Sequence, residues 1–310
     1  MGKKLENVCL FCFLIWPFLH GSFESVKVRD TPLKPLGKQN SIINQEIIVE
    51  GKNTETMLAI TWREFDVDLH NGGFQISSQP LKIQERANSG EGTGLIVWDG
   101  SIVLAKFLEV EFCNTTLKGK KVLELGSGTG LVGLAAAILG ADQVMLTDLE
   151  YTLDNIRDNV KLNQGNFVYE KVDVFELDWM KISAEDSEKQ LECTDTPPAT
   201  VDPLHADSQK PVRTILDRVK GTSLILAADV VWVEELISPL VLTIRKILDV
   251  ADPNCLLYLS YQSRSTRADR KLFGLIKEVG LSTEELSAQR LHPEYSSKRI
   301  KIYKIFKVIA

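Results

Sequence analysis

The chain contains the run Val122-Leu123-Glu124-Leu125-Gly126-Ser127-Gly128-Thr129-Gly130, and the apolar segment Leu131–Leu139 follows it directly. Apolar residues that lead into closely spaced glycines and then into a helix-like pattern predict a strand, a tight turn and a helix. The first N–H groups of such a helix are unpaired and point at whatever fills the turn. Because glycine has no Cβ, a ligand can lie directly against the backbone. The run therefore predicts a nucleoside-binding site.

A carboxylate follows at the spacing that ribose recognition requires. The strand-like run Gln143–Thr147 ends in Asp148, about 20 residues past the glycines, where it can accept hydrogen bonds from both ribose hydroxyls. The residues from Gly128 to Gly133 also fit the dinucleotide pattern G-x-G-x-x-G, so an NAD-dependent oxidoreductase is an alternative. Glu124 favours S-adenosylmethionine, because a carboxylate before the glycines suits the ammonium group of that cofactor and a dinucleotide fold usually has an apolar residue there.

The composition restricts the class of protein. The chain has 310 residues, 44% of them hydrophobic, which is ordinary for a globular protein of one large domain or two small ones. A net charge of -6 argues against a nucleic-acid partner. The five cysteines are irregularly spaced and the four histidines are scattered, so we expect no disulfide framework and no metal site.

The N-terminus carries a conflicting signal. Lys3 and Lys4 precede an apolar run over residues 8–19, which resembles a signal peptide and is short for a membrane span. A secreted enzyme would lack S-adenosylmethionine, so we treat residues 1–22 as an apolar leader of unclear role. We expect a cytoplasmic protein, with membrane association through residues 8–19 as the alternative.

Residues 23–94 form a polar N-terminal extension. Within it, Phe65–Leu69 and Phe74–Ile76 alternate at period two on either side of Asn71-Gly72-Gly73, which predicts a β-hairpin. The segment Ala87–Gly94 has the composition of a flexible link.

A catalytic domain is predicted over residues 95–310, where strand and helix signals alternate. The expected strands are Lys121–Leu125, Gln143–Thr147, Phe167–Val174, Ser223–Ala228 and Leu256–Ser260. The expected helices are Ser101–Leu108 (capped by Ser101), Leu131–Leu139, Leu153–Leu162, Leu236–Leu248 and Arg270–Val279. This alternation predicts an α/β fold, a Rossmann-like and mostly parallel sheet with helices on both faces. The polar, proline-containing residues 181–220 are expected to be a partly disordered loop.

The end of the chain differs from a dinucleotide domain. Arg299–Val308 alternates with no helix after it and suits an antiparallel final strand beside Ser282–Leu291. Class I methyltransferase sheets usually end in this way.

Several segments together carry a family resemblance. They are Val97-Trp98-Asp99 before a helix, the run from Glu124 to Gly133, Leu177-Asp178-Trp179, and Ala228-Asp229-Val230-Val231-Trp232 followed by Glu234 and Glu235. Over roughly residues 95–308 the chain resembles the seven-β-strand lysine methyltransferases of the methyltransferase-like 21 group, which includes the enzyme that methylates valosin-containing protein. The resemblance implies that Trp98 and Trp179 lie against the cofactor. The cofactor-binding residues predicted from the motifs and the resemblance are Trp98, Glu124, Gly126, Ser127, Gly128, Asp148, Trp179 and Ala228.

The predicted acceptor side follows the fourth strand of the domain. Asp229 closes an apolar strand at its carboxyl end, where open α/β sheets bind ligands, although it could instead cap the next helix. The family motif Asp-x-x-Tyr reads Asp229-x-x-Trp232 here, which loses the hydroxyl and keeps a flat aromatic face. Asp229 and Trp232 are the predicted catalytic residues. We expect Asp229 to accept a hydrogen bond from the amine, and Trp232 and Tyr261 to flank the ammonium by cation–π contact.

The predicted activity is S-adenosylmethionine-dependent protein-lysine N-methylation. The resemblance implies a protein substrate such as a chaperone, an ATPase or a translation factor. Glu234 and Glu235 could attract a lysine-bearing segment or simply complement a helix N-terminus. The alternatives are methylation of a small molecule or of another side chain such as histidine, and a non-catalytic adaptor with the same fold.

Overall fold

The computed structural model describes residues 23–32, 43–51, 55–60, 64–86, 92–113, 117–167, 169–188 and 212–308. The predicted leader over residues 1–22 lies outside them. None of the helices in these described ranges has the length and apolar character that a membrane span needs.

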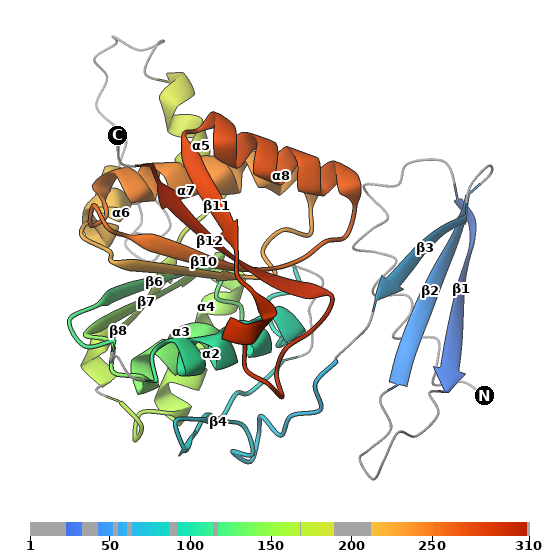
Figure 1. The fold of residues 1–310 in the computed structure, drawn as a ribbon, viewed down its shortest axis with the longest axis horizontal. Coiled ribbons are helices and arrows are strands. Elements are labelled where there is room, and N and C mark those ends of the chain that lie inside the picture. Colours follow the sequence, from blue (N-terminus) through green and yellow to red (C-terminus); the bar gives the residue numbers. More distant parts are fainter. Residues whose placement is uncertain are drawn as a thin grey trace, which may run out of the picture.

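A seven-stranded sheet forms the centre of the molecule (Figure 1). Its strands are β6 Lys121–Leu125, β7 Gln143–Asp148, β8 Val172–Glu176, β9 Leu224–Ala228, β10 Leu256–Gln262, β11 Leu281–Glu285 and β12 Ile300–Lys307. The order is β11-β12-β10-β9-β6-β7-β8. The neighbours from β10 to β8 pair in parallel, and β12 is antiparallel to both β10 and β11. The predicted mostly parallel sheet with an antiparallel final strand is therefore confirmed.

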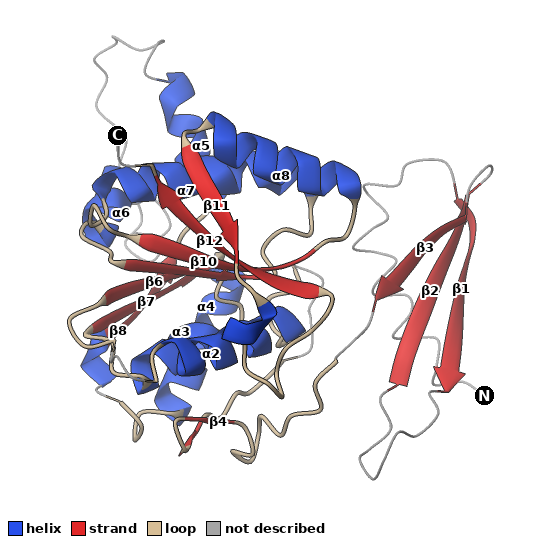
Figure 2. Ribbon diagram, in the orientation of Figure 1, coloured by secondary structure: helices blue, strands red, loops and turns tan. Residues whose placement is uncertain are grey.

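Helices cover both faces of this sheet (Figure 2). They are α2 Asp99–Glu111, α3 Leu131–Ile138, α4 Glu150–Leu162, α5 Trp179–Glu188, α6 Val212–Val219, α7 Ile237–Val250 and α8 Thr266–Glu278. Helices α2, α3 and α4 pack in one apolar core, whereas α5 to α8 pack in a second core on the opposite face. Burial on both faces explains why β9 is apolar at every position.

The described residues up to position 86 form two units. Strands β1 Phe23–Pro32, β2 Ile43–Gly51 and β3 Glu55–Ile60 make a three-stranded antiparallel sheet. Residues 64–86 contribute Leu69, Phe74 and Ile76, each at most 1% exposed, to the core that contains α2 and α3.

The hairpin predicted between Phe65–Leu69 and Phe74–Ile76 is wrong. The observed hairpin is shorter and lies further along the chain, between β4 Gln75–Ile76 and β5 Gln79–Pro80. Its turn uses Ser77 and Ser78 at φ angles of 47° and 66°. Asn71-Gly72-Gly73 instead makes a local turn around Asp68, whose side chain accepts a hydrogen bond from the Asn71 N–H at 2.9 Å.

Other boundaries also differ from the predictions. Residues 169–171 are a 3-10 turn, so β8 begins at Val172 rather than at Phe167. Helix α2 begins at Asp99, and Ser101 lies inside it and does not cap it. The loop predicted over residues 181–220 is helical at both described ends. Helix α6 packs because Ile215, Leu216 and Val219 form an apolar stripe that contacts the second core.

Candidate functional site

A cavity of about 310 Å³ opens at the carboxyl ends of β6, β7, β8 and β9. This size lies at the lower end of the range of small-molecule sites, roughly 300–1,000 Å³. Its lining includes seven of the eight predicted cofactor-binding residues and both predicted catalytic residues: Trp98, Gly126, Ser127, Gly128, Asp148, Trp179, Ala228, Asp229 and Trp232. Ligands bind at this end of the strands in open α/β sheets.

The glycine loop, residues 126–130 between β6 and α3, forms the floor of the cavity. Gly126 and Gly128 have φ angles of 65° and 55°, which disfavour any side chain. A Cβ on Gly126 would lie 2.7 Å from the Val230 side chain, and a Cβ on Gly128 would lie 3.0 Å from the Gly94 carbonyl oxygen. The missing side chains therefore let the loop backbone approach both walls closely.

Asp148 joins the loop to the end of β7. Its Oδ2 accepts a hydrogen bond from the Gly128 N–H and its Oδ1 accepts one from the Leu149 N–H, each at 2.7 Å. Burial raises the pKa of Asp148 to about 6, and these two N–H donors oppose the rise. Each carboxylate oxygen has a second lone pair, so Asp148 can still accept hydrogen bonds from two hydroxyls in the cavity.

Two indole rings line the cavity. The Trp98 Nε1–H donates a hydrogen bond to the Thr93 carbonyl oxygen at 3.0 Å, which fixes the ring before α2. Trp179 is the first residue of α5 and lies close to Gly126, since a Cβ on that glycine would be 3.3 Å from the indole. Both positions offer aromatic surface to a planar base.

Asp229 follows Ala228 directly and has a φ of 53°, a strained backbone for a residue other than glycine. Its Oδ2 accepts a hydrogen bond from the Gly100 N–H at 2.9 Å, and its Oδ1 lies 3.9 Å from Arg264 Nη2. Burial raises the pKa of Asp229, and the Arg264 guanidinium opposes this rise. Asp229 thus binds the N-terminus of α2 and does not cap the helix that follows it.

Trp232 and Tyr261 have different environments. Trp232 lines the cavity and is 49% exposed, so its ring is available at the rim. Tyr261 is buried in the second core, where its hydroxyl donates to the Asp269 carboxylate and its ring contacts Phe273 and Tyr303. The expectation that Tyr261 flanks the acceptor amine is wrong, because this side chain packs against α8.

Glu124 is the one predicted cofactor-binding residue that does not line the cavity. It is 1% exposed, and its Oε2 accepts a hydrogen bond from the Gly133 N–H of α3 at 2.9 Å. Burial raises its pKa to about 8. This placement does not support the expected contact with a ligand ammonium, and it makes Glu124 a link between β6 and the first turns of α3.

Thr93 and Gly94 form one wall of the cavity, although their segment was predicted to be a flexible link and not part of the site. The Gly94 N–H donates to the Tyr151 hydroxyl at 3.1 Å, and a Cβ on Gly94 would lie 2.8 Å from Thr152. The glycine therefore permits close packing against α4.

The strand order, the antiparallel β12 and the cavity above the glycine loop define a class I methyltransferase. A family model described as lysine methyltransferase matches residues 75–194. The protein N-lysine methyltransferase METTL21A of Danio rerio is 33% identical over 217 residues, which cover 70% of this chain and 78% of that protein. The EEF1A lysine methyltransferase 3 of Mus musculus is 41% identical over 90 residues, 29% of this chain and 38% of that protein.

Among solved structures, the CcbJ methyltransferase from Streptomyces caelestis aligns with a TM-score of 0.45 at 12% identity, covering 70% of this chain and 93% of that one. The similarity to the relative from Danio rerio extends over most of that protein. The chain therefore belongs to the methyltransferase-like 21 group of protein-lysine methyltransferases.

Proposed function

We propose that the chain methylates the side-chain amine of a lysine in a protein substrate, with S-adenosylmethionine bound in the cavity above the glycine loop. One observation carries this proposal: Asp148 and Asp229 line the same cavity at two separate places, one suited to the cofactor and one to the acceptor. Asp148 lies at the glycine loop, and Asp229 lies after β9 beside the exposed ring of Trp232. The proposed catalytic domain spans residues 95–310.

The residues of the cavity suit this cofactor. Gly126 and Gly128 leave room for a ligand along the loop backbone. Asp148 retains acceptor capacity for ribose hydroxyls, and the Trp98 and Trp179 rings suit contact with the adenine and methionine parts. When bound, S-adenosylmethionine supplies a methyl group on a positively charged sulfur.

The chain itself would mainly align the acceptor, as an in-line displacement requires. A lysine amine has an unperturbed pKa near 10.4 and must lose a proton before its lone pair can react. Asp229 is held by Gly100 and can accept a hydrogen bond from the amine, which would direct the lone pair into the cavity. The exposed face of Trp232 would stabilise the cationic forms of the amine by cation–π contact.

The substrate is proposed to be a folded cytoplasmic protein, such as a chaperone, an ATPase or a translation factor. The name of the relative from Mus musculus, an EEF1A lysine methyltransferase, supports the translation factor among these.

Calorimetric titration tests the cofactor assignment. We expect the protein to bind S-adenosylhomocysteine, the demethylated product, and to bind NAD weakly or not at all. Tight binding of NAD without binding of S-adenosylhomocysteine would overturn the proposal.

A further inference from the structure

The extended segment 80–86 lies along α4 and is held there by asparagine side chains. Asn163 Oδ1 accepts from the Lys82 N–H at 2.9 Å and its Nδ2 donates to the Lys82 carbonyl at 2.6 Å. Asn159 makes the same pair of bonds to Gln84, at 2.7 and 3.1 Å. Asn166 Nδ2 donates to the Pro80 carbonyl at 2.6 Å. We name Asn159, Asn163 and Asn166 the asparagine ladder.

The spacing of the ladder has a geometric reason. Four residues of helix rise about 6 Å, and two residues of extended chain rise about 6.6 Å. Asn159 lies in α4 and Asn163 directly follows its last turn, four positions later. Their side chains therefore meet every second residue of the segment, Gln84 and Lys82. The intervening residues, Leu81 and Ile83, donate their N–H groups to the other side, to the carbonyls of Phe74 and Leu69, each at 2.8 Å. The segment is paired like a strand on both edges.

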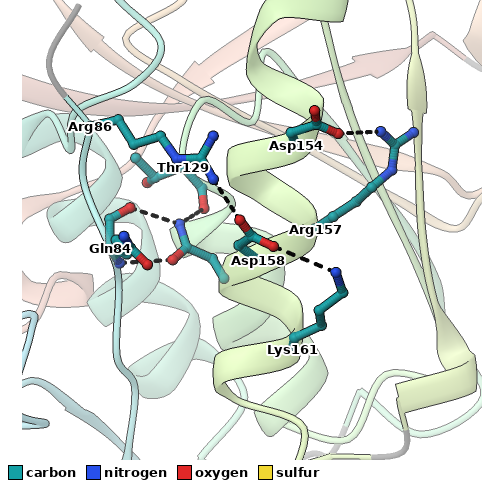
Figure 3. A network of polar contacts seen from close by, with 8 residues as sticks. Gln84, Arg86, Thr129, Asp154, Arg157, Asp158 and Lys161 are labelled. Carbon is teal, nitrogen blue, oxygen red and sulfur yellow. Dashed lines mark hydrogen bonds and ion pairs between the residues drawn. The ribbon is translucent and has the colours of Figure 1, made fainter.

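Asn159 makes one bond that the rest of the ladder does not share. Its Nδ2 also donates to the carbonyl oxygen of Thr129 at 3.0 Å, and Thr129 belongs to the glycine loop and lines the cavity. Figure 3 shows Gln84 and Thr129 beside α4; each is hydrogen-bonded to the Asn159 side chain and not to the other. Asn159 is fully buried, so its three hydrogen bonds do not compete with water.

The segment also holds the side of the cavity that Trp98 forms, here named the Trp98 wall. The Arg86 N–H donates to the Leu95 carbonyl at 3.0 Å, and Glu85 Oε1 accepts from the Val97 N–H at 2.7 Å. Residues 95–97 lead directly into Trp98, which lines the cavity. Through one amide, Asn159 thus connects the glycine loop to the segment that anchors the Trp98 wall.

We propose that Asn159 is a positioning residue for the cofactor, which sets the separation between the glycine loop and the Trp98 wall. This inference rests on the proposed function, because it takes the cavity as the S-adenosylmethionine site. Asn163 has the same role in holding the segment and makes no contact with the loop. It therefore separates positioning of the cofactor site from simple stabilisation of the fold.

The test compares Asn159→Asp with Asn163→Asp in the full chain. Each substitution replaces an amide donor with an oxygen that faces carbonyl groups, so both variants should unfold at a lower temperature than the wild type. Only Asn159→Asp should also weaken the binding of S-adenosylhomocysteine. We expect its Kd to rise about tenfold, the cost of one buried hydrogen bond, with Asn163→Asp within about twofold of the wild type.

A second pair keeps the inference testable if Asn159→Asp does not fold. Gln84→Pro removes the N–H that donates to Asn159, and Lys82→Pro removes the N–H that donates to Asn163. The inference predicts weaker cofactor binding for Gln84→Pro alone. If the wild type binds S-adenosylhomocysteine and the two members of each pair of variants have equal Kd values for it, the inference is overturned and the proposed function remains intact. Failure of the wild type to bind would overturn both.

Discussion

Asp229 Oδ2 accepts a hydrogen bond from the Gly100 N–H at 2.9 Å, although the two residues lie 129 positions apart in the chain. Gly100 is in the first turn of α2, where N–H groups have no partner within the helix. The N-terminus of a helix favours a negative charge, so this contact fixes the position of the Asp229 carboxylate. The left-handed backbone of Asp229, which typically costs about 1–3 kcal/mol, is held in place by the contact.

This relationship predicts that Gly100→Ala lowers methyl transfer. A Cβ on Gly100 would lie 2.4 Å from Asp229 Oδ2, so the carboxylate must move. We expect the turnover number to fall at least about tenfold, because alignment of the acceptor is the main contribution of the chain. The Kd for S-adenosylhomocysteine should change little. Gly274→Ala is the matched control, since a Cβ there meets nothing within 4 Å in helix α8, and it should leave turnover unchanged.

Cofactor binding is predicted to weaken in acid through Asp148. The carboxylate must be ionised to accept two hydroxyl donors, and burial raises its pKa to about 6 in the free protein. The Kd for S-adenosylhomocysteine should therefore rise as the pH falls through about 6. Asp148→Asn should bind about ten- to a hundredfold more weakly, with little pH dependence over this range. An equally steep pH dependence in this variant would assign the titration to another group.

Glu124 is predicted to make the fold less stable as the pH rises. Its pKa is about 8 in the folded chain, above its ordinary value of 4.5, so the folded state holds a proton that the unfolded state releases. The stability from this group is fully present below about pH 4.5 and is lost as the pH rises through about 8. Glu124→Gln keeps the acceptor for Gly133 without the charge. Thermal unfolding between pH 5 and 8.5 should show the Tm of this variant rising relative to the wild type. A constant difference in Tm would contradict the account.

Trp232 is predicted to act on the acceptor and not on the cofactor. Trp232→Ala should lower methyl transfer to a protein lysine about two- to fivefold, the scale of a cation–π contact at an exposed site, and leave cofactor affinity nearly unchanged. Trp232→Tyr keeps an aromatic face and should retain most of the activity. Steady-state kinetics and calorimetry together measure both effects. Unchanged turnover in Trp232→Ala would show that the ring only packs at the rim.

The sequence predicts the parts of the site that local patterns control. Strand β6, the glycine loop and Asp148 were predictable because an apolar strand, a glycine turn and a terminal carboxylate are all signals within short segments. The environments of Glu124 and Tyr261 were not predictable from the sequence. Both faces of a strand inside such a sheet are buried, so the pattern of apolar residues does not show which side chains face the cavity and which face the core. The contact between Asn159 and Gln84 joins residues 75 positions apart, which no local pattern shows.

The most direct test of the proposed function is to locate the transferred methyl group. Recombinant protein is incubated with cell lysate and S-adenosylmethionine labelled in the methyl group, and the label is mapped by mass spectrometry, with Asp229→Asn as the matched control. We expect label on lysine side chains of one or a few proteins with the wild type, and loss of that label with Asp229→Asn. Label confined to histidine or to small molecules, or undiminished transfer by Asp229→Asn, would contradict it.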